Sequence, residues 1–338
     1  MLSGRLPAEH GHWNLHYFDP NGSPFRWLRH LPAPLLTRLN NRWGRRGLTE
    51  LGRRFFDLGP TFECVVRPDL LPWFNWAEKR HLFQVGSLEP THNAFDHWRE
   101  AGLRYRIYSY RHGNDQQLMK RACRDLERGR VDAIFLYLCE LDHTLHMHRS
   151  EPAAIARALE GYAGPLQCLY RAAARRDAGM RFRLFSDHGM APVRELVDIA
   201  SPLASLGLHS PKDYLAIFDS TMLRFWFFTA EARQSIAAWL TSLTCGRILD
   251  EADLRGQGVW FPDGRFGELI FLLHPGLMVA SGEFNGGSWS PNGMHGYDPD
   301  DADSDAVLLS NCPGDRGLQS IQDLFGLLCE PLRAGSES

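Results

Sequence analysis

Apolar runs of strand length alternate with longer helical patterns along this chain, and this alternation narrows the possible folds more than any other feature. The runs suited to buried strands are 105–110, 133–139, 182–185, 222–228, 269–273 and 306–309. The helical patterns are 93–101, 115–128, 152–176, 230–243 and 318–328. Such alternation predicts an α/β fold, a three-layer α/β/α sandwich in which helices cover both faces of a mostly parallel central sheet.

Composition excludes several classes of protein. The net charge of −3 gives no general attraction to nucleic acid polymers. We also expect no membrane span, because no apolar stretch approaches the roughly 20 residues that a transmembrane helix needs. Seven scattered cysteines, with no Cys-x-x-Cys pair, argue against a disulfide framework. We therefore expect a reduced, cytoplasmic setting. An export signal on an upstream segment is the alternative, and the oligomeric state is left open.

Three short fragments carry metal-ligand side chains. Asp187 and His188 follow a predicted strand and precede Gly189, whose turn would let both side chains converge. Asp142 and His146 follow another strand and are four residues apart, which places them on one face of a helical turn. His295 lies between two glycine-containing pairs. Carboxylate and imidazole groups at the carboxyl ends of strands are typical of a divalent metal site.

These fragments, in this order, resemble the alkaline phosphatase superfamily, and most closely its type I phosphodiesterase/nucleotide pyrophosphatase branch. The matching motifs are Asp-x-x-x-His at 142–146, Ser-Asp-His-Gly-Met at 186–190 and His-Gly at 295–296. Residues 3–11, followed by Asn14, are similar to the family segment that comes after its nucleophile. The resemblance spans nearly the whole chain. It implies a single alkaline-phosphatase-like domain over 1–338.

The resemblance also implies a site with two divalent metal ions. Asp142, His146 and His295 would bind one ion, and Asp187 and His188 the other. Zn²⁺ is the first expectation and Mn²⁺ the alternative, since mixed Asp/His sites suit both. The side-chain amide of Asn14 would donate to a phosphoryl oxygen of the substrate, a small phosphate ester. The implied reaction is in-line attack on phosphorus by a metal-bound Thr or Ser, followed by hydrolysis of the phospho-enzyme.

Two positions depart from the family pattern. The family nucleophile lies before the segment that matches Ser3, so we expect it upstream of Met1 and expect this polypeptide alone to be weakly active or inactive. A late start-site assignment, a split gene and a true pseudoenzyme are the open explanations. An inactive metal-binding module is accordingly one alternative function, and a phosphotransferase or phosphomutase of the same superfamily is another. Leu145 also replaces the Gly that usually precedes the motif His.

Two segments interrupt the strand and helix pattern. Residues 20–80 contain several Pro and Trp residues and an Arg-rich patch, with eight arginines between residues 26 and 54. We predict that they form a helical cap or insertion over the active face. Residues 245–300 are rich in Gly, Asp and Pro around a single predicted strand. We predict that they form a loop-rich region over the metal site.

Overall fold

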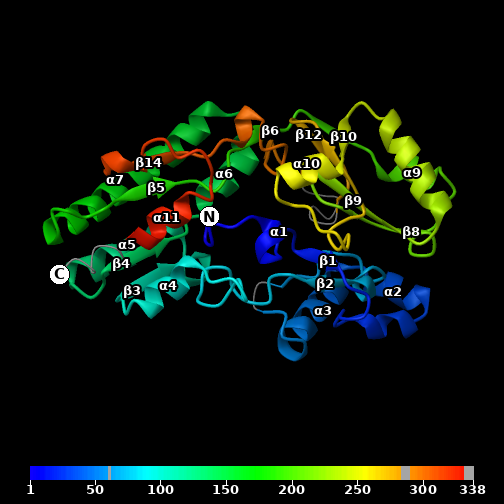
Figure 1. The fold of residues 1–338 in the computed structure, drawn as a ribbon, viewed down its shortest axis with the longest axis horizontal. Coiled ribbons are helices and arrows are strands. Elements are labelled where there is room, and N and C mark those ends of the chain that lie inside the picture. Colours follow the sequence, from blue (N-terminus) through cyan, green and yellow to red (C-terminus); the bar gives the residue numbers. More distant parts are fainter. Residues whose placement is uncertain (60–61, 283–289, 331–338) are drawn as a thin grey trace.

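A computed structural model describes residues 1–59, 62–282 and 290–330. Figure 1 shows two groups of elements, with strands β3, β4, β5 and β14 on the left and β8–β11 on the right. The fold class predicted from the sequence, α/β, is confirmed. No described helix combines the length and apolar character that crossing a bilayer requires.

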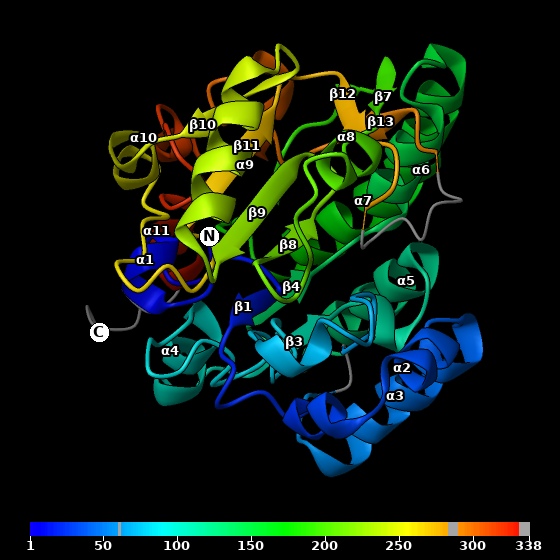
Figure 2. The ribbon, with the colours of Figure 1, turned by 90° about the vertical axis from the view of Figure 1, so that its right-hand side faces the viewer.

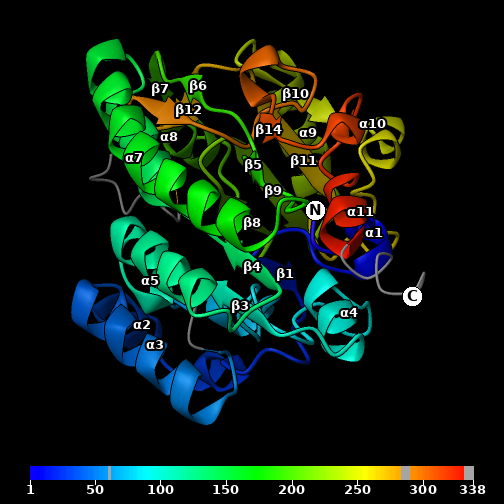
Figure 3. The same cartoon turned by 90° about the vertical axis from the view of Figure 1, so that its left-hand side faces the viewer.

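The left-hand group is a layered α/β unit. Its strands are β3 (Tyr105–Tyr108), β4 (Ala133–Leu136), β5 (Arg183–Phe185) and β14 (Leu308–Ser310). β3 pairs with β4 in parallel, and β5 pairs with β14 in antiparallel register. Helices α5 (Asp115–Glu127) and α7 (Pro152–Arg176) cover one face, while α4 (Ala94–Glu100) and α11 (Leu324–Cys329) cover the other (Figure 3).

Alternation along the strands explains why both faces are covered. Phe135 and Ile107 belong to the apolar cluster that includes Trp98 of α4, whereas Ile134, which precedes Phe135 in β4, belongs to the cluster that includes Leu169 of α7. Successive side chains of a strand point to opposite faces, so a run that is apolar at every position needs a helix on each side. The six strand runs predicted from the sequence all contain a strand, although the 133–139 strand ends at Leu136 and Cys139 begins a helix.

The right-hand group is built on a four-stranded sheet in the order β10-β11-β9-β8, with every neighbouring pair antiparallel. Its strands are β8 (Tyr214–Phe218), β9 (Met222–Phe227), β10 (Gly246–Leu249) and β11 (Leu269–Leu273). α9 (Ala230–Ser242) and α8 (Ala200–Ala204) cover one face through Leu223 and Phe225. Thus two of the runs expected in a parallel sheet, 222–228 and 269–273, belong to an antiparallel sheet of their own.

The opposite face of this sheet carries the N-terminal part of the chain. Helices α2 (Ala33–Leu39) and α3 (Arg42–Phe55), the 3-10 turns Arg26–His30 and Leu71–Trp73, and the strand pair β1 (His16–Phe18) and β2 (Phe74–Trp76) form this layer (Figure 2). Phe62 and Trp76 pack there with Trp226 and Ile217 of the sheet. Residues 20–80 are therefore an added helical layer.

The remaining elements of the described chain are short. They are α1 (Pro7–His10), α6 (Glu140–His148), β6 (Ala191–Pro192), β7 (Glu195–Val197), α10 (Glu251–Gly256), β12 (Leu277–Val279) and β13 (Gly293–Met294), with 3-10 turns at Tyr110–His112, Ala302–Ser304 and Pro313–Asp315. β12 pairs with β7 and β13 with β6. Residues 245–300 therefore contain more regular structure than their composition predicts.

His16, in β1, makes the fold sensitive to acid. Its ring is buried against Trp76, and the burial together with the charge of Arg224 lowers its pKa to about 3. In the unfolded chain its pKa is about 6.5, so below that pH the unfolded state binds the extra proton and stability is lost. Between pH 6.5 and 4.5 we expect the natural chain to lose about 2 kcal/mol more than His16→Phe. Urea unfolding at both pH values measures this difference. His30→Gln, at an exposed position, should not reduce it.

Candidate metal centre and adjacent cavity

Helix α6 presents the first pair of predicted ligands. A carboxylate of α5 holds the start of α6, because buried Asp115 accepts hydrogen bonds from the backbone N–H groups of Cys139 (3.2 Å) and Glu140 (3.0 Å). These are N–H groups that a helix start leaves without intrahelical partners. One turn separates Asp142 from His146, and His146 Nε2 lies 3.5 Å from Asp142 Oδ2. The four-residue spacing thus places both side chains on one face.

His295 reaches the same point from a segment 149 residues further along the chain than His146. Its Nε2 lies 4.0 Å from Asp142 Oδ1, and the ligand atoms of Asp142, His146 and His295 all lie within 4.8 Å of one another. Gly293 permits this approach, because a Cβ there would lie 2.6 Å from the carbonyl oxygen of Leu145. The carbonyl of Gly293 also accepts a hydrogen bond from His146 Nδ1 at 2.8 Å.

Asp187 and His188 follow β5 and lie beside this cluster. The His188 ring stacks on His295, with centroids 3.9 Å apart and planes inclined by 23°. Asp187 Oδ1 lies 3.5 Å from His188 Nε2. The sequence suggested that Gly189 is needed to form a turn, but the structure shows that it is needed because the backbone of another segment passes close to it. A Cβ there would lie 2.2 Å from the carbonyl oxygen of Asp303, and its N–H donates to Ser304 at 3.0 Å.

The tautomers of two histidines fit metal binding. A carbonyl oxygen only accepts, so in neutral His146 the proton is on Nδ1, toward Gly293, and the lone pair of Nε2 faces Asp142. In the same way His188 Nδ1 lies 2.9 Å from the carbonyl of Gly189, and its Nε2 faces Asp187. An electron-rich nitrogen facing a carboxylate oxygen favours a cation between them. A backbone carbonyl on the other ring nitrogen is the usual support of a metal-bound histidine.

The burial and the charges of the cluster residues also fit metal binding. Burial, reinforced by the neighbouring His188 and His146, lowers the pKa of His295 to about 3, so its imidazole is neutral at neutral pH. Asp142 Oδ1 is buried and accepts no hydrogen bond from any described residue. Burial also raises the pKa of Tyr137, with the Asp187 and Asp142 carboxylates adding to the effect. The cluster therefore combines the neutral imidazole of His295 with nearby carboxylates, and these are the forms in which such residues bind metal ions.

A cavity of about 530 Å³ opens beside the cluster and is lined by both His146 and His295. Its walls are mainly apolar and include Met222, Leu249, Leu272 and Trp13. Asn14 lines it too, and the amide nitrogen of Asn14 is buried with no hydrogen-bond partner among the described residues. Within 245–300, the lining residues come from β10, β11, residues 257–259 after α10 and the segment around His295. None of the described lining residues comes from 20–80.

Residues 1–298 match the sequence profile of the type I phosphodiesterase/nucleotide pyrophosphatase family. The chain belongs to this family. No protein with a curated description matches it. Among solved structures, human ectonucleotide pyrophosphatase/phosphodiesterase 5 is 15% identical with a TM-score of 0.59, over 78% of this chain and 76% of that one. An inactive variant of the murine protein in complex with AMP gives 15% identity and a TM-score of 0.59 over 74% and 72%.

A bacterial structure shares the fold as well. Phosphonoacetate hydrolase of Sinorhizobium meliloti, in complex with phosphonoacetate, is 13% identical with a TM-score of 0.50, over 73% of this chain and 74% of that one. At these identities the structural matches show the fold alone. The assignment to the phosphodiesterase family depends on the sequence match, and the metal-ligand roles of the clustered residues stay predictions.

The residues predicted from the sequence lie close together in the fold, but the residues that support them were not predicted. Asp115 has no motif signal, because its role depends on where α5 meets α6. Tyr137 reads as a strand residue, and only the folded chain places its hydroxyl near two carboxylates. His148, the last residue of α6, lies outside the cluster, with its Nδ1 3.0 Å from Glu151 Oε1.

Proposed function

We propose that this protein is a metal-dependent phosphohydrolase of the phosphodiesterase/nucleotide pyrophosphatase type. The observation that supports it best is the convergence of Asp142, His146 and His295 within 4.8 Å at the wall of a cavity. His188, stacked on His295 and adjacent to Asp187, extends this cluster toward a second ion position. Zn²⁺ is the preferred metal and Mn²⁺ the alternative.

Divalent ions held here would polarise phosphoryl oxygens and stabilise the charge that develops on the attacking and leaving oxygens. The side chains of the protein would orient the substrate and the metal ligands. Asn14 donates its amide to a phosphoryl oxygen, a contact that strengthens as negative charge develops there. His146 and His188 keep their Nε2 lone pairs toward the carboxylates because backbone carbonyls hold their Nδ1 protons.

The cavity accommodates the organic part of the substrate. Its mainly apolar walls favour a phosphate ester with an apolar or aromatic group, and its volume of about 530 Å³ lies within the range for small-molecule sites. The AMP complex of the murine relative supports a small phosphate ester as the ligand class. We propose no nucleic acid polymer as substrate, given the net charge of −3.

Metal-dependent binding of AMP tests this function. We expect AMP to bind the chain loaded with Zn²⁺ or Mn²⁺, measured by calorimetry, and to bind at least about tenfold more weakly after chelation or in Asp187→Ala. AMP affinity that is independent of both would contradict the proposal. The same samples are assayed with bis(4-nitrophenyl) phosphate. Turnover that needs added metal and is lost in Asp187→Ala would contradict the expectation that this polypeptide alone is weakly active or inactive.

A further inference from the structure

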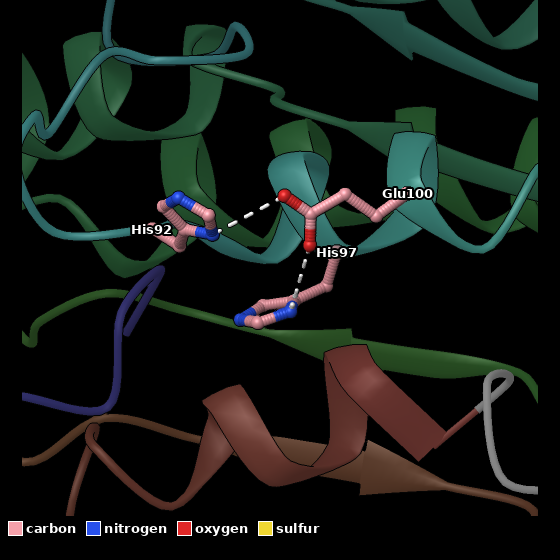
Figure 4. Close-up of side chains that lie close together, drawn as sticks. All are labelled: His92, His97 and Glu100. Carbon is pink, nitrogen blue, oxygen red and sulfur yellow. Dashed lines mark ion pairs between the residues drawn. The ribbon is translucent and has the colours of Figure 1, made fainter.

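A second group of metal-ligand side chains lies on α4, away from the cluster of α6. The group consists of His92, His97 and Glu100, whose candidate ligand atoms all lie within 4.8 Å of one another (Figure 4). α4 and α6 are well separated in two perpendicular views (Figures 1 and 2). This group, which we call the α4 triad, shares no residue with the candidate metal centre.

The carboxylate of Glu100 lies between the two imidazoles of the α4 triad. Its Oε1 lies 3.3 Å from His92 Nδ1, and its Oε2 lies 3.8 Å from His97 Nδ1. Ligands about 2.0–2.1 Å from a tetrahedral zinc ion are separated from one another by about 3.4 Å. The ligand atoms of the triad are therefore close to the spacing that one ion requires.

The backbone that carries the triad is firmly held. Asn93, which follows His92, is fully buried and caps α4 by accepting from the N–H groups of Phe95 and Asp96. Its amide donates to the carbonyl of Gln84 at 2.8 Å, which ties the preceding loop to the helix. His97 and Glu100 are three residues apart, so they share one helix face. Ordering the triad around an ion thus costs mainly side-chain freedom.

One imidazole of the α4 triad packs against helix α11, and all three side chains remain accessible to solvent. The His97 ring packs against Phe325 of α11, with centroids 5.7 Å apart at 64°. The side chains of the triad are open to solvent, at 55%, 36% and 47% exposed for His92, His97 and Glu100. An ion can therefore enter from solution, and water can complete its coordination. Exposed imidazole–carboxylate pairs contribute little stability by themselves.

We propose that the α4 triad is a peripheral binding site for a transition-metal ion of the zinc type, with two imidazole nitrogens and one carboxylate as ligands. This donor set suits Zn²⁺ and its neighbours in the first row rather than Ca²⁺ or Mg²⁺, which prefer oxygen ligands. The bound ion links the loop before α4 to the last turn of that helix. The proposal does not depend on the function proposed for the α6 cluster.

Zn²⁺ stoichiometry in a background that silences the α6 cluster tests the triad. In Asp142→Asn/His295→Ala, competition of the whole chain with a chromophoric chelator should report a Zn²⁺ equivalent bound at the triad. Adding Glu100→Gln, or separately His92→Ala, should remove this equivalent or weaken it at least about tenfold. Co²⁺ in place of Zn²⁺ should give a visible absorption band that disappears in the same variants.

His274→Ala is the matched control, because this exposed histidine belongs to neither group. It should leave the Zn²⁺ equivalent unchanged. Circular dichroism confirms that each variant is folded, and Glu100→Gln preserves the shape of the side chain. The proposal is overturned if Glu100→Gln and His92→Ala both keep the full Zn²⁺ equivalent, or if His274→Ala removes it equally, since the binding would then be nonspecific.

Discussion

Replacing Asp142 with Asn should lower the affinity of the α6 cluster for Zn²⁺ at least about 100-fold. The two oxygens of Asp142 face different imidazoles, at 3.5 Å from His146 and 4.0 Å from His295. Asn keeps the shape but loses the negative charge and offers an N–H₂ group where one imidazole lone pair points. Chelator competition in the Glu100→Gln background, which removes the α4 triad, measures the affinity.

In the absence of metal, Asp142→Asn should leave the stability of the chain unchanged or increase it. Asp142 Oδ1 accepts no hydrogen bond from the described residues and the side chain is 41% exposed, so an uncharged amide there removes no hydrogen bond of Oδ1 on which the fold depends. His143→Ala is the matched control, because this neighbouring histidine is exposed and lies outside the cluster. Unchanged affinity in Asp142→Asn, combined with a large loss in His143→Ala, would show that the opposite face of α6 binds the metal.

The sequence predicted the motif residues of the cluster because each fragment combines a local pattern with ligand chemistry. An apolar run ending in Ser186-Asp187-His188 predicts ligands at the end of a strand, and the helix spacing of Asp142 and His146 needs no tertiary information. The same local periodicity predicted the main strands and helices. Helix-forming stretches such as 152–176 are long and strongly patterned, and α7 occupies that range.

The pairing of the strands could not be predicted in this way. The runs at 222–228 and 269–273 are apolar at nearly every position, which fits either a parallel central sheet or a sheet covered on both faces by other elements. The structure shows the second case, because α9 covers one face and the N-terminal layer around Trp76 covers the other. Such runs indicate that a strand is buried on both faces, and they do not indicate whether its neighbours are parallel or antiparallel.

The cavity could not be predicted from the sequence either, because segments that are far apart in the chain form its lining. Its lining joins residues from the N-terminal segment, α6, the turn between β8 and β9, β10, residues 257–259, β11 and the loop around His295. Apart from the histidines, these side chains look ordinary in sequence, as Leu249 and Thr221 do. Glycines whose necessity depends on contact are equally hidden, since Gly189 and Gly293 are constrained by backbone atoms far away in the chain.

Arg224→Met should destabilise the fold by about 3–5 kcal/mol, the largest stability effect that we expect from a single substitution. Arg224 is fully buried, donates from Nε to Asp219 at 2.8 Å and donates from Nη1 to the carbonyl of His16 at 2.9 Å. Burial already raises the pKa of Asp219, although Arg224 opposes this effect. Without the guanidinium, the buried carboxylate has no compensating charge. Chemical denaturation at neutral pH measures the loss.

Two further variants separate a broken buried pair from a simple loss of packing. Arg224→Met/Asp219→Leu removes both charges, so most of the stability should return, as is observed when buried pairs are replaced by apolar residues. Arg265→Met breaks an exposed pair with Asp263, 2.8 Å apart and 41% and 51% exposed, and should cost at most about 1 kcal/mol. If Arg224→Met costs no more than Arg265→Met, the buried pair does not hold the N-terminal layer against the sheet. If the double variant is less stable than Arg224→Met, the carboxylate of Asp219 is stabilised by groups other than Arg224.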